Sequence, residues 1–200
     1  MNRRNYSAGM VKLSFWFLEY RKFVILSLEG LSVEDIKRKN ILENIFSAPT
    51  TARAIEIFSA VSARARGLNG RLHEIFADND VGTQKLIALI AIMNIDSLFF
   101  DFVYEVYREK LLIGSGTLTD SDVNVFFSNK QVQSEKVAGW KDVTLKRLGA
   151  CYKTLLTEAG LIDRSSNERR IIRPILDKRL IDGLIESGMA VFVEALTGGR

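Results

Sequence analysis

Cysteine and histidine are nearly absent from this sequence. There is one cysteine, Cys151, and one histidine, His73, among 200 residues. A single thiol cannot form an intramolecular disulfide, which is typical of proteins that work in the reducing cytoplasm. One histidine provides neither a pair of imidazoles for zinc nor, with no Ser-His-Asp arrangement in view, a catalytic triad. The aspartates match helix starts and caps better than a magnesium site. We therefore expect no metal, no cofactor and no enzymatic activity.

Proline and long apolar runs are also scarce. Only two prolines occur, and few segments alternate as β-strands do, so the composition favours a mainly helical protein. A membrane span needs about 20 consecutive apolar residues. The run from residue 13 to 28 contains Glu19, Arg21 and Lys22, and the run from residue 86 to 93 is short. We interpret both as buried helices of a soluble, cytoplasmic protein with no membrane partner.

Residues 117–174 have the pattern of a helix-turn-helix followed by a wing. Thr119 is the expected N-cap of a first helix, with Asp120 and Asp122 in its first turn, where the helix dipole favours acids. A short second helix is expected at about residues 134–139. The third helix should run from about residue 141 to 159 and stop at Gly160.

The third helix of this segment has two faces. Its apolar residues recur at three- and four-residue spacing and share one side: Leu145, Leu148, Tyr152, Leu155, Leu156 and Ala159. The opposite side carries Lys146, Arg147, Lys153 and Thr154, with Ala150 between them allowing close approach to a surface. After Gly160, residues 161–174 predict a basic β-hairpin containing Arg169, Arg170 and Arg173, although residues 170–173 do not alternate cleanly.

Positive charge is concentrated in the same segment. Residues 130–179 hold 12 Lys and Arg against 6 Asp and Glu, whereas residues 1–129 hold 15 of each and residues 180–200 hold one basic and three acidic residues. A basic segment of this kind is expected of a phosphate-binding surface. The alternative is an ordinary solvated helix face.

A second, weaker helix-turn-helix candidate precedes it. A helix from residue 32 to 40, with Ser32 as its expected N-cap, carries Lys37, Arg38 and Lys39. A turn at residues 47–50 leads to a helix that starts at Thr50 or Thr51 and ends near Arg66. On that helix we expect one face to hold Ile55, Phe58, Val61, Ser62 and Ala65, and the other face, with the arginines outward, to hold Arg53, Ala60 and Arg64. Residues 1–10 should form a loose basic arm before a helix at 11–29. We expect three regions, 1–66, 67–116 and 117–200, which could form one compact unit.

Several segments resemble one known family. They are Tyr6-Ser7-Ala8-Gly9, the run 40–53 that ends in Ser47-Ala48-Pro49-Thr50-Thr51-Ala52-Arg53, residues 95–102 and residues 140–163. Together they are similar to BrxA, the small core protein of BREX (bacteriophage exclusion) defence systems. The resemblance implies an all-helical fold with two helix-turn-helix units and double-stranded DNA binding. It also implies that methyltransferase and ATPase activities belong to other subunits. If the fold is wholly helical, residues 161–174 form a basic loop and not a wing.

The sequence leaves three functional hypotheses. The leading one is a non-enzymatic, monomeric double-stranded DNA-binding component of a BREX-type system. Its contact residues would be Lys146, Arg147, Lys153, Arg169, Arg170 and Arg173, with Lys37, Arg38, Lys39, Arg53 and Arg64 added by the N-terminal segment. The second is an adaptor whose basic face docks an acidic protein, such as another BREX subunit. The third is an RNA-binding protein similar to NusB-type antiterminators, with which the family has been compared.

Overall fold

The structure, a computed structural model, describes residues 6–164 and 168–199. It divides the chain into two compact units. We call Phe15–Ile95 the N-terminal unit, and Met1–Ser14 together with Asp96–Arg200 the C-terminal unit. Most of the expected loose arm, residues 1–5, lies outside the described residues. The division into the regions 1–66, 67–116 and 117–200 stays a prediction.

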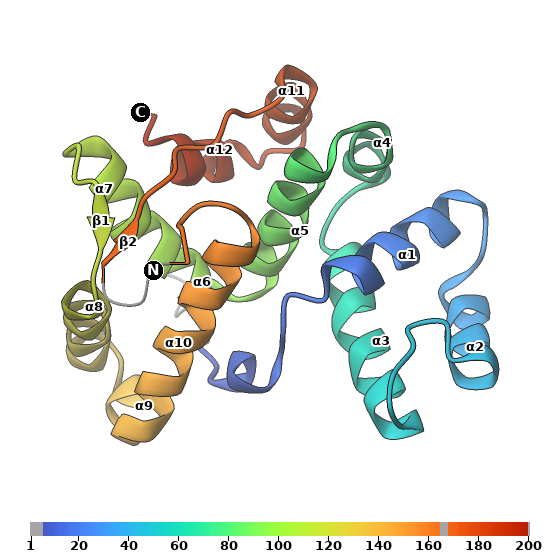
Figure 1. The fold of residues 1–200 in the computed structure, drawn as a ribbon, viewed down its shortest axis with the longest axis horizontal. Helices are drawn as coiled ribbons and strands as arrows, with labels where there is room; N and C mark the ends of the chain where they lie inside the picture. Colours follow the sequence, from blue (N-terminus) through green and yellow to red (C-terminus); the bar gives the residue numbers. More distant parts are fainter. Residues whose placement is uncertain (1–5, 165–167, 200) are drawn as a thin grey trace. The chain divides into compact units, whose positions relative to one another are not determined.

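The N-terminal unit is wholly helical in the part that the structure describes. Its helices are α1 (Phe17–Leu28), α2 (Val33–Glu43), α3 (Thr51–Arg66), α4 (Gly70–Asp78) and α5 (Val81–Ile95) (Figure 1). As expected, Ser32 caps α2 by accepting a hydrogen bond from the backbone N–H of Asp35. Thr50 caps α3 in the same way. The helix predicted from residue 11 was wrong at its start, because Trp16 adopts a left-handed backbone (φ 48°) that an α-helix does not accommodate.

The buried sector of α3 is wider than the face predicted. Phe58, Val61, Ser62 and Ala65 are buried as expected, but Ile55 is 43% exposed, and both Ala60 and Arg64 are buried. Ala54 and Ile57 complete the face that packs into the unit. Because α3 packs against more than one neighbouring helix, its buried sector is wider than one apolar stripe.

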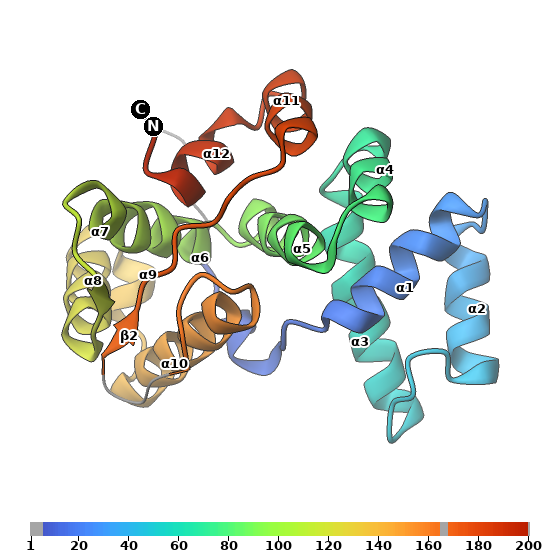
Figure 2. The ribbon, with the colours of Figure 1, turned by 45° about the horizontal axis from the view of Figure 1, so that its top comes forward.

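The C-terminal unit is helical with one short hairpin, so the mainly all-α prediction is confirmed. It opens with the 3₁₀ turn η1 (Gly9–Lys12). Later elements are α6 (Ser97–Phe102), the π-helical turn η2 (Val103–Tyr107), α7 (Arg108–Leu112), β1 (Thr117–Leu118), α8 (Asp120–Gln133), α9 (Glu135–Ala138), α10 (Asp142–Glu158), β2 (Arg169–Arg170), α11 (Lys178–Glu186) and α12 (Ala190–Thr197). Figure 2 shows α12 beside α7. The Phe192 ring of α12 meets the Phe100 ring of α6 edge-on, with the ring centroids 5.4 Å apart.

A small sheet joins the segments before α8 and after α10. β1 pairs antiparallel with β2, with Thr117 opposite Arg170 and Leu118 opposite Arg169 (Figure 1). The chain leaving α10 joins on the other side of β2, through a bridge between Ile162 and Ile171. The hairpin expected at 161–174 is therefore present in short form, and the wholly helical alternative does not hold. Its tip, residues 165–167, lies outside the described residues.

Aromatic side chains fill the centre of the C-terminal unit. The Tyr152 ring on α10 lies 5.0 Å from Phe99, 5.2 Å from Phe102 and 6.0 Å from Phe127. These rings join α6, α8 and α10 into one core. All six apolar residues predicted on the inner face of α10 are buried. Cys151, next to this core, donates its thiol hydrogen to the carbonyl oxygen of Met10 (3.3 Å).

A buried ion cluster links α8 to α6 and η2. The ammonium group of Lys130 lies 3.1 Å from Oδ2 of Asp101 and 2.6 Å from Oε1 of Glu105. The Tyr6 hydroxyl donates to the same Asp101 oxygen (2.6 Å). Tyr6 is buried, so this part of the expected loose arm is instead packed into the unit. The cluster shows why a lysine occupies an inward position on α8: its charge is paired.

Gly149 allows α10 to approach α8 closely. A Cβ at this position would lie 2.6 Å from Cγ1 of Val123 and 3.6 Å from Cε2 of Phe127.

Gly149→Ala should therefore lower the free energy of unfolding. Overpacking costs about 1–3 kcal/mol, which outweighs the gain of about 1 kcal/mol in helix propensity. In a Val123→Ala background the Cγ1 atom that the new Cβ would meet is absent, so Gly149→Ala should raise the free energy of unfolding. Urea unfolding of wild type, the two single variants and the double variant tests this, and an effect of equal sign in both backgrounds would contradict it.

Among the described residues, no single helix is both long and apolar enough to cross a membrane. Val81–Ile95 and Ser97–Leu112 reach that length and apolarity only when taken together across the bend between them.

Candidate nucleic-acid interface

The outward face of α10 is an accessible basic surface, as the sequence predicted. Lys146 and Arg147 are exposed, as are Ala150 and Thr154 one and two turns further along. Neither Lys146 nor Arg147 forms an ion pair within the described chain. Two neighbouring cations without a carboxylate partner are available to an anionic ligand such as a phosphate.

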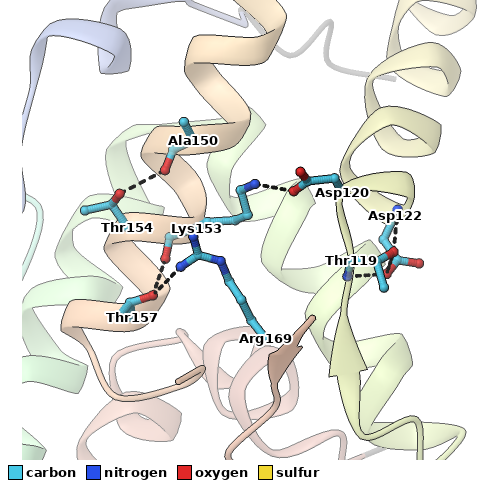
Figure 3. A network of polar contacts seen from close by, with 8 residues as sticks. All are labelled: Thr119, Asp120, Asp122, Ala150, Lys153, Thr154, Thr157 and Arg169. Atoms are coloured by element: carbon cyan, nitrogen blue, oxygen red, sulfur yellow. Dashed lines mark hydrogen bonds and ion pairs between the residues drawn. The ribbon is translucent and has the colours of Figure 1, made fainter. Parts of the chain in front are cut away.

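Lys153 lies on the side of α10 that faces α8. Its ammonium group pairs with Asp120, the first residue of α8, and its side chain is only 15% exposed (Figure 3). Sequence reasoning placed Lys153 on the polar side of α10 but did not anticipate this partner. This ion pair holds α10 against α8, and a phosphate would have to compete with Asp120 for the ammonium group of Lys153.

The acids at the start of α8 are themselves fixed. Thr119 accepts from the backbone N–H of Asp122, and the Asp122 carboxylate accepts from the backbone N–H of Thr119 (2.8 Å). Lys110 pairs with the same carboxylate at 2.8 Å. Partial burial raises the pKa of Asp122, but the hydrogen bonds from Lys110 and Thr119 outweigh it and hold the pKa below its usual value. The expected N-cap is confirmed, and it orients the end of α8 that holds Lys153.

The three arginines predicted as contact residues in the hairpin region have different environments. Arg169 donates from Nη1 to the Thr157 hydroxyl (3.2 Å), which ties β2 to α10 (Figure 3). The Arg170 side chain is 75% exposed, and its Nε lies 3.9 Å from Oδ2 of Asp163. Arg173 is exposed and donates to the carbonyl oxygen of Leu111 (3.3 Å). Arg170 and Arg173 therefore remain accessible, whereas Arg169 is held against the helix.

The predicted cations of α2 lie at its surface, but two of them are paired along the helix. Arg38 contacts Asp35 at 2.6 Å, and Lys39 contacts Glu43 at 3.1 Å. Lys37 is exposed. Exposed pairs of this kind contribute little and open readily, so they do not prevent these cations from meeting a phosphate.

The guanidinium groups of the two arginines predicted on α3 lie over the ring of Trp16. Arg53 pairs with Glu56 at 2.7 Å and lies 4.8 Å above the indole ring. Arg64 is 1% exposed and donates from Nη1 to the carbonyl oxygen of Phe15 (2.6 Å). The placement of Arg64 on a DNA-contacting face was wrong, because its guanidinium is needed inside the unit to satisfy that buried carbonyl.

Val143 is the accessible residue of α10 that sequence reasoning passed over. It lies in the first turn of the helix and is 52% exposed. The spacing Val143, Arg147, Ala150, Thr154 follows the four-three-four rhythm of one helix face, so the periodicity could have found it.

Other kinds of site are less well supported. The described residues contain no group of three or more His, Cys, Asp or Glu side chains able to hold a metal ion. A pocket of about 210 Å³ lies between α2 and α3, lined by Asn40, Ile41, Asn44, Ala48, Pro49, Thr50, Thr51 and Ala54. None of these side chains is charged, and the basic face of α10 is not part of this pocket.

The fold and the exposed face of α10 define a mainly helical protein with a short hairpin tied to its basic helix. The chain belongs to the BrxA family, whose model matches residues 4–188. It is 40% identical over 182 residues to the BREX protein BrxA of Bacillus cereus (strain H3081.97), covering 91% of each chain. The resemblance noted in the sequence is thereby confirmed, and BrxA is a component of BREX phage defence.

A solved structure has the same fold. The crystal structure of an uncharacterized protein from Magnetospirillum magneticum matches with a TM-score of 0.82, covering 97% of this chain and 99% of that one. At 18% identity the likeness shows the fold alone.

Proposed function

We propose that this protein is a non-enzymatic, double-stranded DNA-binding component of a BREX-type defence system. The observation that carries the proposal is the element order of the C-terminal unit. Helices α6 and α7 precede β1, then come α8, the short α9 and α10, and the chain returns through residues 161–163 and β2 to pair with β1. This is the order of a winged helix-turn-helix, in which the helix after the turn enters the major groove.

In this proposal α10 is the helix that enters the groove, with Lys146 and Arg147 pointing at DNA. Arg170 and Arg173 contact the phosphates beside the groove, since both are exposed cations of the hairpin region. Lys153 and Arg169 act mainly by holding α10 against α8 and β2. Phosphate contacts of this type set orientation and carry no base sequence.

The N-terminal unit is proposed to add weaker contacts. Lys37, Arg38 and Lys39 lie at least partly exposed on α2, and Arg53 is half-exposed at the start of α3. Two helix-turn-helix units on one chain allow a monomer to bind DNA without a second subunit. Other BREX proteins are proposed as further partners.

Fluorescence anisotropy of labelled duplex DNA over a range of salt concentrations tests this function. We expect affinity to fall steeply with salt, with a log–log slope near −3 to −4, because about four exposed cations at roughly −0.9 each release counterions. RNA of matched length, in duplex and single-stranded form, should bind more weakly. Preference for RNA would favour the antiterminator-like alternative. Absence of binding to either at low salt would favour a protein-docking role.

A further inference from the structure

We propose that α10 recognises thymine methyl groups in the major groove, so that binding is selective for thymine-containing sites. The proposal rests on the proposed function and adds what the helix reads. Its observation is an apolar stripe on the outward side of α10, formed by Val143, Ala150 and the methyl group of Thr154, with Arg147 among them.

The stripe is geometrically narrow. At 100° per residue, positions 143, 147, 150 and 154 fall within a sector of about 60° on one side of the helix. The core contacts of α10 come from the opposite side, where Leu148 and Tyr152 are fully buried. Val143 is 52% exposed and lies outside that buried face. A single exposed valine is common on protein surfaces, but this one lies beside two cations that have no ion-pair partner in the described chain, on the helix proposed to enter DNA.

Hydrogen bonding leaves Arg147 as the donor of this stripe. The Thr154 hydroxyl donates to the carbonyl oxygen of Ala150 within the helix (3.0 Å), as Figure 3 shows. Its hydrogen is therefore used, so Thr154 offers a ligand its methyl group and an acceptor oxygen but no donor. Ala150 presents only a methyl group. Arg147 is then the hydrogen-bond donor within the sector, between Val143 and Ala150, which can make only apolar contacts.

Asp142 and Arg147 carry polar groups that suit base edges. Asp142, the first residue of the helix, is exposed and follows the exposed N-cap residue Lys141, so the charges of these two side chains oppose each other. In the major groove, the apolar group that bases present is the thymine C5-methyl, and the donor that suits an acid is the cytosine amino group. Arg147 suits guanine, whose two acceptors it can meet together.

The experiment has two steps and uses the full chain. Selection from a pool of random 20-base-pair duplexes should enrich a site with thymine at one or more fixed positions. The selected duplex is then remade with deoxyuridine at those positions, which removes only the methyl group. Wild-type protein should bind the deoxyuridine duplex about 3- to 5-fold more weakly for each thymine methyl group that the helix touches. Val143→Ala should lose the preference at the thymine that Val143 contacts and keep it at any thymine met by Ala150 or Thr154, so its total preference should be smaller than that of wild type.

Val132→Ala is the matched control, because Val132 is a 90% exposed valine on α8. It should retain the wild-type preference, and the melting temperatures of both variants should stay close to that of wild type. A pool without thymine enrichment, equal wild-type affinity for the two duplexes, or an undiminished preference in Val143→Ala would each overturn the inference. If no duplex binds at any salt concentration, the proposed function fails with it, whereas salt-sensitive binding without thymine preference removes the inference alone.

Discussion

Replacing Lys146 and Arg147 together by glutamate is expected to weaken duplex-DNA binding by roughly 100-fold at moderate salt. Both side chains are exposed on α10 and neither has an ion-pair partner in the described chain, so reversal turns two attractive contacts into two repulsive ones. The log–log salt slope should become shallower by about two contacts, or roughly 1.8. Because neither residue is buried, the free energy of unfolding should change by less than about 0.5 kcal/mol. Anisotropy titrations and urea unfolding measure the two effects separately.

The pair Lys37→Glu and Arg38→Glu serves as the matched comparison. It makes the same change in charge at adjacent exposed positions, on α2 of the N-terminal unit. We expect a loss of less than about 10-fold there, since this unit is proposed to add weaker contacts. Equal losses from the two pairs would place both units in the interface to the same degree. Unchanged affinity of the folded Lys146 and Arg147 variant would remove α10 from it.

Lys130→Met is expected to have the largest effect on stability, lowering the free energy of unfolding by about 3–5 kcal/mol. Lys130 is 3% exposed and Asp101 is 2% exposed, so replacing Lys130 removes a cation that pairs with a buried carboxylate. Desolvation of that charge is what makes the loss large. Urea unfolding followed by circular dichroism measures it, with Lys146→Met as the exposed control, for which a change below about 0.5 kcal/mol is expected.

The double variant Lys130→Met with Asp101→Asn separates pairing from packing. A neutral amide can still accept the hydrogen bond of Tyr6 without requiring a cation. The double variant should therefore be more stable than Lys130→Met alone. A double variant as unstable as the single one would show that the lysine chain matters through its packing beside Phe126, where the ammonium lies 5.4 Å from the ring centre.

The electrostatics of the basic segment differ between the sequence and the structure. By composition, residues 130–179 offer 12 cations. In the structure Lys130 is buried, Lys153 is paired with Asp120 and Arg169 is bonded to Thr157. The cations available to a ligand are therefore fewer than the composition suggests, and Lys146 and Arg147 are two adjacent exposed cations among those that remain.

Local patterns in the sequence determined the helices and many of their ends. The three-four spacing of Leu148, Tyr152 and Leu155 predicted the buried side of α10 correctly. An α-helix repeats every 3.6 residues, so this spacing places the three side chains on one side, and all three favour the core. Thr119, Ser32 and Thr50 predicted helix starts, since an N-cap depends on a hydrogen bond within three residues. The family resemblance rested on similar short segments.

What only the tertiary structure decided is which side chains meet across the fold. Arg64 was predicted to face outward on its helix, yet it bonds a carbonyl 49 residues away. Lys153 meets Asp120 from a different helix, and β2 pairs with a strand that precedes α8. Helical periodicity gives the angular position of a residue around the axis of its helix. Whether that angle faces water, a carboxylate or the core depends on the neighbouring elements, and their placement follows from the packing of the whole unit.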